Sequence, residues 1–178
     1  PVKILKVFGQ TIYNLRYSIL TIIFIVVSAK LMTYAGMISI IANGIVLATG
    51  KFYPFFAPFI GAFGAFITGS ATNCNVLFGP LQSAVAGNLS SDMNFTYWLV
   101  ASNAGSGGIG KMVSPQSIAI AIAAITPAIA AYAKQKQISK DIEDNLYNSI
   151  TPSSIMSSSY LYMFLFLTIY ALITYFGS

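Results

Sequence analysis

The sequence predicts an all-α integral membrane protein, and three observations lead to that class. Of the 178 residues, 56% are hydrophobic and only 7% are charged, whereas an ordinary soluble domain has about 25% charged residues. Long apolar stretches recur along the chain, and two of them are interrupted near the middle by small and polar residues. The bilayer is therefore the better solvent for this chain, and the interruptions must be surrounded by protein or water.

The first two predicted elements are a transmembrane helix and a connecting helix. Residues 12–36 contain a long apolar run, and about 20 apolar residues cross a bilayer core. Lys30 lies in the second half of this span, so its side chain must reach the interface or face protein. Residues 37–52 are apolar but interrupted by Asn43 and two glycines. This stretch is too short for a second span, so we expect a connecting or interfacial helix.

The next stretch, residues 53–87, predicts a re-entrant helical hairpin. Its two apolar arms, residues 55–67 and 76–86, flank a polar centre at residues 68–75. At about 1.5 Å per residue each arm reaches only partway across a membrane. A single spanning helix with such a centre would be costly. The hairpin would place the polar tip inside the bilayer; one discontinuous helix is the alternative.

Residues 95–131 predict a broken transmembrane helix, interrupted at residues 104–114. Each glycine in a helix costs about 0.8–1 kcal/mol relative to alanine, so we expect the glycine-rich residues 105–110 to be unwound. Ser114 followed by Pro115 is typical of an N-cap with proline at the first helical position. A new helix should begin there. Close helix packing is the alternative use of the glycines.

The remaining elements are a polar connecting helix over residues 133–151 and a final transmembrane helix over residues 155–176, whose tyrosines suit the membrane interfaces. If residues 53–87 are re-entrant, both main groups of cations fall on the cytoplasmic side, as the positive-inside rule requires. A simple crossing would place the groups on opposite sides. The six cations are Lys3, Lys6, Arg16, Lys134, Lys136 and Lys140.

Composition argues against several classes of function. The sequence contains no histidine and one cysteine, Cys74, which leaves no Ser-His-Asp triad, histidine-ligated metal or internal disulfide. We therefore expect no enzyme, no catalytic residue, no metal site and no bound cofactor. A membrane-embedded enzyme with Ser70 as nucleophile is the weakest alternative, because no base is available to activate it. The cations form no clustered face, so nucleic acid is not an expected partner; the lipid bilayer is.

The two polar breaks predict one shared binding site. In transporters, the N-termini of half-helices direct partial positive charge at an anion near the membrane midplane. The two second arms start near Asn73 and at Ser114, and both starts can converge on one carboxylate. Each polar side chain also has a plainer use in satisfying backbone groups, and Lys111 can cap carbonyls rather than bind an anion. The candidate site residues are Ser70, Thr72, Asn73, Asn75, Asn103, Ser106, Gly107, Gly108, Lys111, Ser114 and Gln116.

Two long segments, Pro58–Gly79 and Ala101–Ala119, resemble the L-lactate permease family, and Met32–Met37 looks like its preceding helix. The resemblance implies uptake of L-lactate, glycolate and related 2-hydroxy monocarboxylates by symport with H⁺ or Na⁺, in a multi-pass protein of the plasma membrane. It also implies an elevator-type carrier built from inverted repeats, and it leaves a homodimer open. The chain resembles the last third of such a permease, so we expect it to be one inverted-repeat half, preceded by further sequence.

One position departs from the family pattern. Many members carry Asp where this chain has Ala71, so proton coupling would use residues outside the chain or the carboxyl group of the substrate itself. Sodium coupling stays open, because Asn, Ser, Thr and carbonyl oxygens can hold a hard cation. A carrier of dicarboxylates or other organic anions is the alternative within transport, and it should need more cationic groups than Lys111. A channel would need a continuous polar stripe, which the sequence does not suggest.

Overall fold

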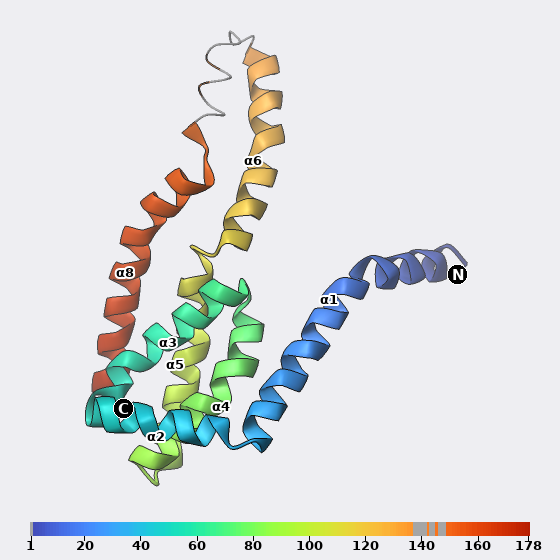
Figure 1. Ribbon diagram of the computed structural model, residues 1–178. Helices are drawn as coiled ribbons and strands as arrows, with labels where there is room; N and C mark the ends of the chain where they lie inside the picture. The colour runs from blue at the N-terminus through green and yellow to red at the C-terminus, as the bar shows by residue number, and fades with distance from the viewer. Residues whose placement is uncertain (1, 137–141, 143–144, 146–148) are drawn as a thin grey trace.

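The computed structural model describes residues 2–136, 142, 145 and 149–178, and all regular structure within them is helical, as predicted (Figure 1). The elements are α1 (Val2–Tyr34), α2 (Met37–Thr49), a short 3₁₀ turn η1 (Gly50–Phe52), α3 (Tyr53–Thr68), α4 (Ala71–Leu89), α5 (Met93–Lys111), α6 (Pro115–Lys136) and α8 (Pro152–Gly177).

Three stretches of the described chain are long and apolar enough to cross a membrane: Met37–Thr68, Pro115–Lys136 and Pro152–Gly177. A shorter apolar helix, Ile22–Tyr34, lies within α1. Only 11% of the most apolar window of α6 is buried inside the molecule, so its apolar surface needs lipid or further protein around it. These helices and their composition are those of a membrane protein.

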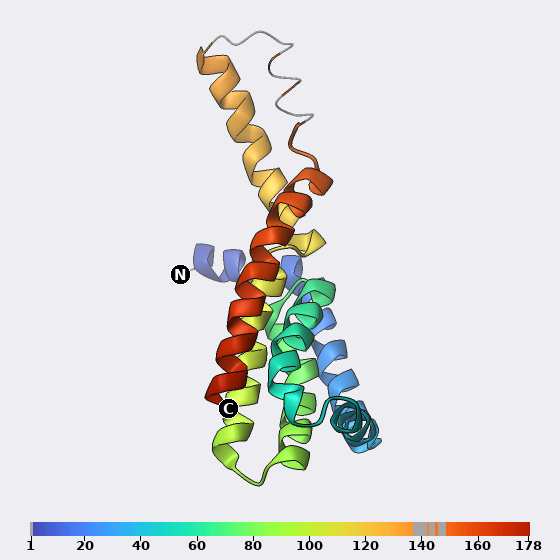
Figure 2. The same cartoon turned by 90° about the vertical axis from the view of Figure 1, so that its left-hand side faces the viewer.

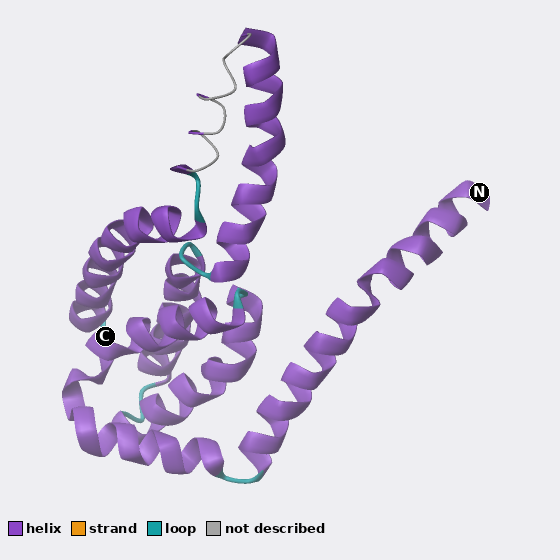
Figure 3. Ribbon diagram, turned by 45° about the horizontal axis from the view of Figure 1, so that its top comes forward, coloured by secondary structure: helices purple, strands orange, loops and turns teal. Residues whose placement is uncertain are grey.

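The first of these stretches is bent, which separates the predicted connecting helix from the hairpin. Gly50 has a positive φ of 51° between α2 and α3. Figure 1 shows α2 lying across the foot of the bundle, while α3 rises from it. α1 runs away from the bundle towards the N-terminus, as Figure 3 also shows.

Helices α3, α4 and α5 form the centre of the fold, and α8 packs along α3 and α5 (Figures 1 and 2). α3 and α4 run in opposite directions and meet at a tight turn, so together they form a helical hairpin. The apolar core lies towards the foot of this bundle, where α2 crosses it. Its buried members are Ile38, Ala42, Tyr53, Ala57, Leu81, Val85, Ala86 and Leu99.

The prediction that residues 105–110 are unwound is wrong, because α5 stays helical to Lys111. The glycines instead let two backbones approach closely. A Cβ on Gly110 would overlap the main-chain carbonyl of Ala62 in α3, and a Cβ on Gly61 would lie 2.8 Å from the Asn103 carbonyl oxygen in α5. Close packing of this kind offsets the low helix propensity of glycine.

The second break is therefore shorter than predicted and occupies only residues 112–114. The new helix begins at Pro115, as the sequence predicted. α6 then extends beyond the bundle to Lys136 (Figure 2). Most of the predicted polar helix over residues 133–151 lies outside the described residues. α8 begins at Pro152, with the Thr151 side chain accepting from the N–H of Ser154.

Candidate functional site

The turn between α3 and α4 exposes the start of a capped helix. Gly69 takes a left-handed conformation with φ 64°, and Ser70 is extended. The Ser70 side chain accepts a hydrogen bond from the N–H of Asn73 at 3.3 Å. The Thr68 hydroxyl donates to the Gly64 carbonyl at 2.8 Å and accepts from the Ser70 N–H at 3.4 Å. The turn is thus held by its own hydroxyl groups, and α4 presents its N-terminus there.

The break between α5 and α6 is built in the same way. Ser114 Oγ accepts from the N–H of Ser117 at 3.3 Å, and the Ser114 N–H donates to the Lys111 carbonyl at 3.1 Å. Ser114 is completely buried. Ser70 and Ser114 therefore have, at least in part, a structural role, because both side chains accept from a backbone N–H of the helix that follows.

The two breaks lie next to each other. A Cβ on Gly69 would overlap the Gln116 side chain in the first turn of α6. A Cβ on Gly107 would lie 3.7 Å from the Cβ of Ala71, the first residue of α4. Figure 1 shows the α3–α4 turn at the level of the α5–α6 break. The N-termini of α4 and α6 are therefore close together, and we call the region around Gly69 and Gln116 the tip.

The predicted site residues divide by exposure. Asn103, Ser106, Gly107 and Ser114 are buried inside the bundle. A second group can be reached from outside, fully or in part: Ser70, Thr72, Asn73, Asn75, Gly108, Lys111 and Gln116. Lys111 forms no ion pair or hydrogen bond with another described side chain, and it lies in the last turn of α5, where its charge also favours the helix C-terminus.

Sequence reasoning missed part of the polar interior. Tyr53 and Gln82 are completely buried and bonded to each other, with Tyr53 Oη donating to Gln82 Oε1 at 2.6 Å. Cys74 is also buried, and its thiol donates to the Gly61 carbonyl at 3.1 Å. A glutamine within an apolar helical arm was the available signal for Gln82, because a buried amide needs partners.

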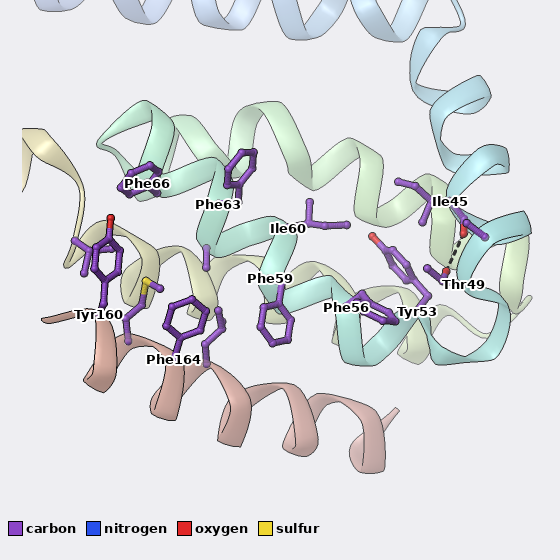
Figure 4. Close-up of a pocket in the computed structure, with 15 residues that line it drawn as sticks. Ile45, Thr49, Tyr53, Phe56, Phe59, Ile60, Phe63, Phe66, Tyr160 and Phe164 are labelled. Carbon is purple, nitrogen blue, oxygen red and sulfur yellow. Dashed lines mark hydrogen bonds between the residues drawn. The ribbon is translucent and has the colours of Figure 1, made fainter. Parts of the chain in front are cut away.

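An apolar cavity lies elsewhere in the molecule. It measures about 660 Å³ and lies between α2, α3 and α8, with aromatic side chains lining it (Figure 4). Its lining includes Phe56, Phe59, Phe63 and Phe164 and no charged residue. A surface of this kind suits hydrocarbon rather than a small anion. The tip, with its polar groups, is the better candidate for binding.

The chemistry available at the tip is that of anion binding. Two helix N-termini supply partial positive charge, the hydroxyl and amide groups supply neutral hydrogen-bond donors, and Lys111, in the last turn of α5, carries a full charge. The hydroxyl of Ser70 accepts from the backbone, and the sequence has no histidine to activate it. Binding of a small carboxylate fits these groups better than covalent catalysis does.

Known proteins resemble this chain along most of its length. Glycolate permease GlcA of Escherichia coli (strain K12) is 45% identical over 123 residues, which are 68% of this chain and 21% of that protein. L-lactate permease of Streptococcus iniae is 47% identical over 96 residues, or 54% of this chain and 20% of the relative. L-lactate permease of Escherichia coli (strain K12) is 42% identical over 126 residues, or 70% and 22%.

The chain thus matches about a fifth of the length of each of these relatives. No solved structure matches it. The family model described as L-lactate permease matches residues 1–164. Because that match covers nearly the whole sequence, the chain belongs to the L-lactate permease family.

Proposed function

We propose that this protein takes up L-lactate and related 2-hydroxy monocarboxylates, such as glycolate, across the plasma membrane by cation-coupled symport. The observation that carries the proposal is the meeting of two capped helix N-termini at the tip, where Gly69 contacts Gln116. The relatives are named for lactate and glycolate, two small monocarboxylates that differ by one methyl group. Helix N-termini commonly bind small anions of this kind.

In this proposal the substrate carboxylate is bound between the N-termini of α4 and α6, with Lys111 as its counter-charge. Amide and hydroxyl groups of Asn73, Asn75 and Thr72 would bind the carboxylate and hydroxyl oxygens of the substrate. No lysine or arginine lies between Lys51 and Lys111. One nearby cation favours a monocarboxylate over the alternative, a dicarboxylate, which would leave its second charge uncompensated.

The hairpin is proposed to be re-entrant and to move with α5 as one body in an elevator motion. Buried hydrogen bonds and close glycine contacts join α3, α4 and α5, which supports their moving together. α2 would act as the connecting arm. The coupling cation is H⁺ or Na⁺, and with Ala71 at the start of α4 a proton would be carried by residues outside this segment or by the substrate itself.

The test is uptake of labelled L-lactate by the full-length protein in proteoliposomes, with an imposed gradient of protons or of sodium. We expect one of the two gradients to drive accumulation. Asn73→Ala should abolish it, and Lys111→Met should raise KM by about 10- to 100-fold, because a hydrogen bond to a charged group contributes about 1.5–3 kcal/mol. Lys51→Met, which removes an exposed lysine at the foot of the hairpin, is the matched control and should leave KM unchanged.

Two results would count against the proposal. If neither gradient drives lactate accumulation by the wild-type protein, lactate symport is wrong. If lactate accumulates but Lys111→Met and Lys51→Met behave alike, the site is not at the tip.

A further inference from the structure

Four side chains form a hydrogen-bonded series from α3 through α4 and α5 towards the tip. Tyr53 Oη donates to Gln82 Oε1 at 2.6 Å. Gln82 Nε2 donates to Asn103 Oδ1 at 3.4 Å, and Asn103 Nδ2 donates to Asn75 Oδ1 at 2.8 Å. Tyr53, Gln82 and Asn103 are completely buried. Solvent therefore does not reach the Tyr53–Gln82 and Gln82–Asn103 bonds, and each of these amides depends on its neighbours for its orientation.

Two main-chain carbonyls set the direction of the series. The Ala57 carbonyl accepts from Gln82 Nε2 at 3.1 Å. A carbonyl oxygen can only accept, so the nitrogen of Gln82 must face Ala57 and its oxygen must face the Tyr53 hydroxyl. Reversing the Gln82 amide would bring two buried oxygens together, which is costly. The second N–H of Gln82 therefore has to meet the oxygen of Asn103.

The second carbonyl supports the same orientation of Asn103. Gly61 O accepts from the Cys74 thiol at 3.1 Å, so the sulfur is left as an acceptor. Asn103 Nδ2 lies 3.9 Å from this sulfur as well as 2.8 Å from Asn75 Oδ1. Both N–H groups of Asn103 are thereby directed at acceptors. The two carbonyls, of Ala57 and Gly61, thus fix the orientations of Gln82 and Asn103. With these orientations, Asn75 can only accept from Asn103 through its side-chain oxygen.

The consequence appears at Asn75, in the second turn of α4. Its oxygen is occupied, while its Nδ2 makes no hydrogen bond within the described part of the chain. The side chain is half-buried. Gly79, one turn further along α4, and Gly108 in α5 have no atom within 4 Å of the position a Cβ would take. The half-buried Asn75 side chain can therefore be reached from outside, and the group available there is an N–H₂ donor.

We propose that Gln82 is a positioning residue that, through Asn103, holds Asn75 as a hydrogen-bond donor to the carboxylate of the substrate. This inference rests on the proposed function and deepens it, because it assigns the carboxylate rather than the coupling cation to Asn75. A sodium ion would need the side-chain oxygen, and that oxygen is turned inwards. Gln82 touches no substrate and acts only by fixing the orientation of two amides.

The experiment compares KM and maximal rate of L-lactate uptake in proteoliposomes for variants of the full-length protein. Gln82→Met keeps the volume and removes the amide, so Asn103 and Asn75 can rotate. We expect KM to rise about tenfold, as for loss of one well-placed hydrogen bond, with the maximal rate within about twofold of wild type. Gln10→Met, at an exposed position in α1, is the control and should change neither quantity.

A second variant, Asn75→Asp, tests the donor directly and keeps the proposal falsifiable if Gln82→Met does not fold. It retains an acceptor for Asn103 but presents an anionic oxygen to the substrate, so KM should rise by about a hundredfold or more. Asn94→Asp, exposed at the start of α5, is its control and should leave KM unchanged.

The outcomes separate this inference from the proposed function. Lactate uptake by the wild-type protein, with an unchanged KM in Asn75→Asp, would overturn the donor role alone. A fall in maximal rate for Gln82→Met at constant KM would reduce Gln82 to a structural residue. Absence of lactate uptake by the wild-type protein would overturn both.

Discussion

The two sides of helix α3 differ in how they are packed. Towards α4 and α5 the backbones are in close contact at Gly61 and Gly110, and buried amides are bonded to one another. Towards α8 the contact is looser and leaves the cavity of about 660 Å³ lined by aromatic rings (Figure 4). The tight side is where polar groups can be held in fixed orientations. The loose side is lined mainly by apolar side chains, so lipid or apolar protein can fill it.

This difference indicates which substitutions should matter. On the tight side even one methyl group must displace the main chain, whereas on the loose side a whole ring can be removed. Three variants test the comparison, and their expected effects decrease from the contact between backbones, through the tip, to the cavity.

The largest effect is expected from Gly110→Ala. The new Cβ would overlap the main-chain carbonyl of Ala62, which cannot move aside as a flexible side chain would. Overpacking of this kind typically costs about 1–3 kcal/mol, and rigid backbone places this site at the upper end. We expect a large fall in the melting temperature of the purified full-length protein in detergent, or no folded protein.

Gly87→Ala is the matched control for that variant. Gly87 lies in α4 and has no atom within 4 Å of the position a Cβ would take. Alanine there should raise stability by up to about 1 kcal/mol through helix propensity. Equal melting temperatures for the two variants would show that α3 and α5 are not in close contact.

The close contact also explains which features the sequence could predict. The start of α6 depends on a local signal, the pair Ser114–Pro115, and the helix begins there as predicted. The second arm of the hairpin was expected to start near Asn73, but α4 begins slightly earlier, at Ala71, with Ser70 as its cap. The state of residues 105–110 depends on α3, some 45 residues earlier in the chain. Local helix propensity predicts unwinding there, because it takes no account of a neighbouring helix against which the glycines can pack.

The polar interior was missed for the same reason. Tyr53, Gln82 and Asn103 are separated by 29 and 21 residues, and nothing in the sequence marks one as the partner of another. Asn103 and Asn75 were found because each lies in or beside a visible polar break. Gln82 lies inside an apolar arm, and its role depends on the carbonyl of Ala57, which any residue type would supply.

At the tip, Gly69→Ala should have an intermediate effect. Gly69 has φ 64°, and a side chain in this conformation costs about 1–2 kcal/mol. Its Cβ would also displace the Gln116 side chain from the start of α6. We expect a modest loss of stability together with a rise of about tenfold in KM for lactate, measured as uptake in proteoliposomes.

Gly36→Ala separates the two causes, since Gly36 has a similar φ of 71° but no neighbouring atom within 4 Å. It should lose a comparable amount of stability and keep the wild-type KM. If both variants raise KM to the same extent, backbone strain rather than contact with Gln116 is responsible, and the two helix starts do not form one site.

The smallest effect is expected from Phe164→Ala in α8. Phe164 lines the apolar cavity and is 55% exposed. In a bilayer the space left by its ring can be filled by lipid, which is as apolar as the side chain it replaces. Stability should therefore fall by about 1 kcal/mol or less, far below the cost of emptying a dry protein core. KM for lactate should stay within about twofold of wild type, because no charged residue lines the cavity. A rise of fivefold or more in the KM of Phe164→Ala, at an unchanged melting temperature, would mean that the substrate binds on the loose side of α3. The binding site would then lie at the cavity and not on the tight side.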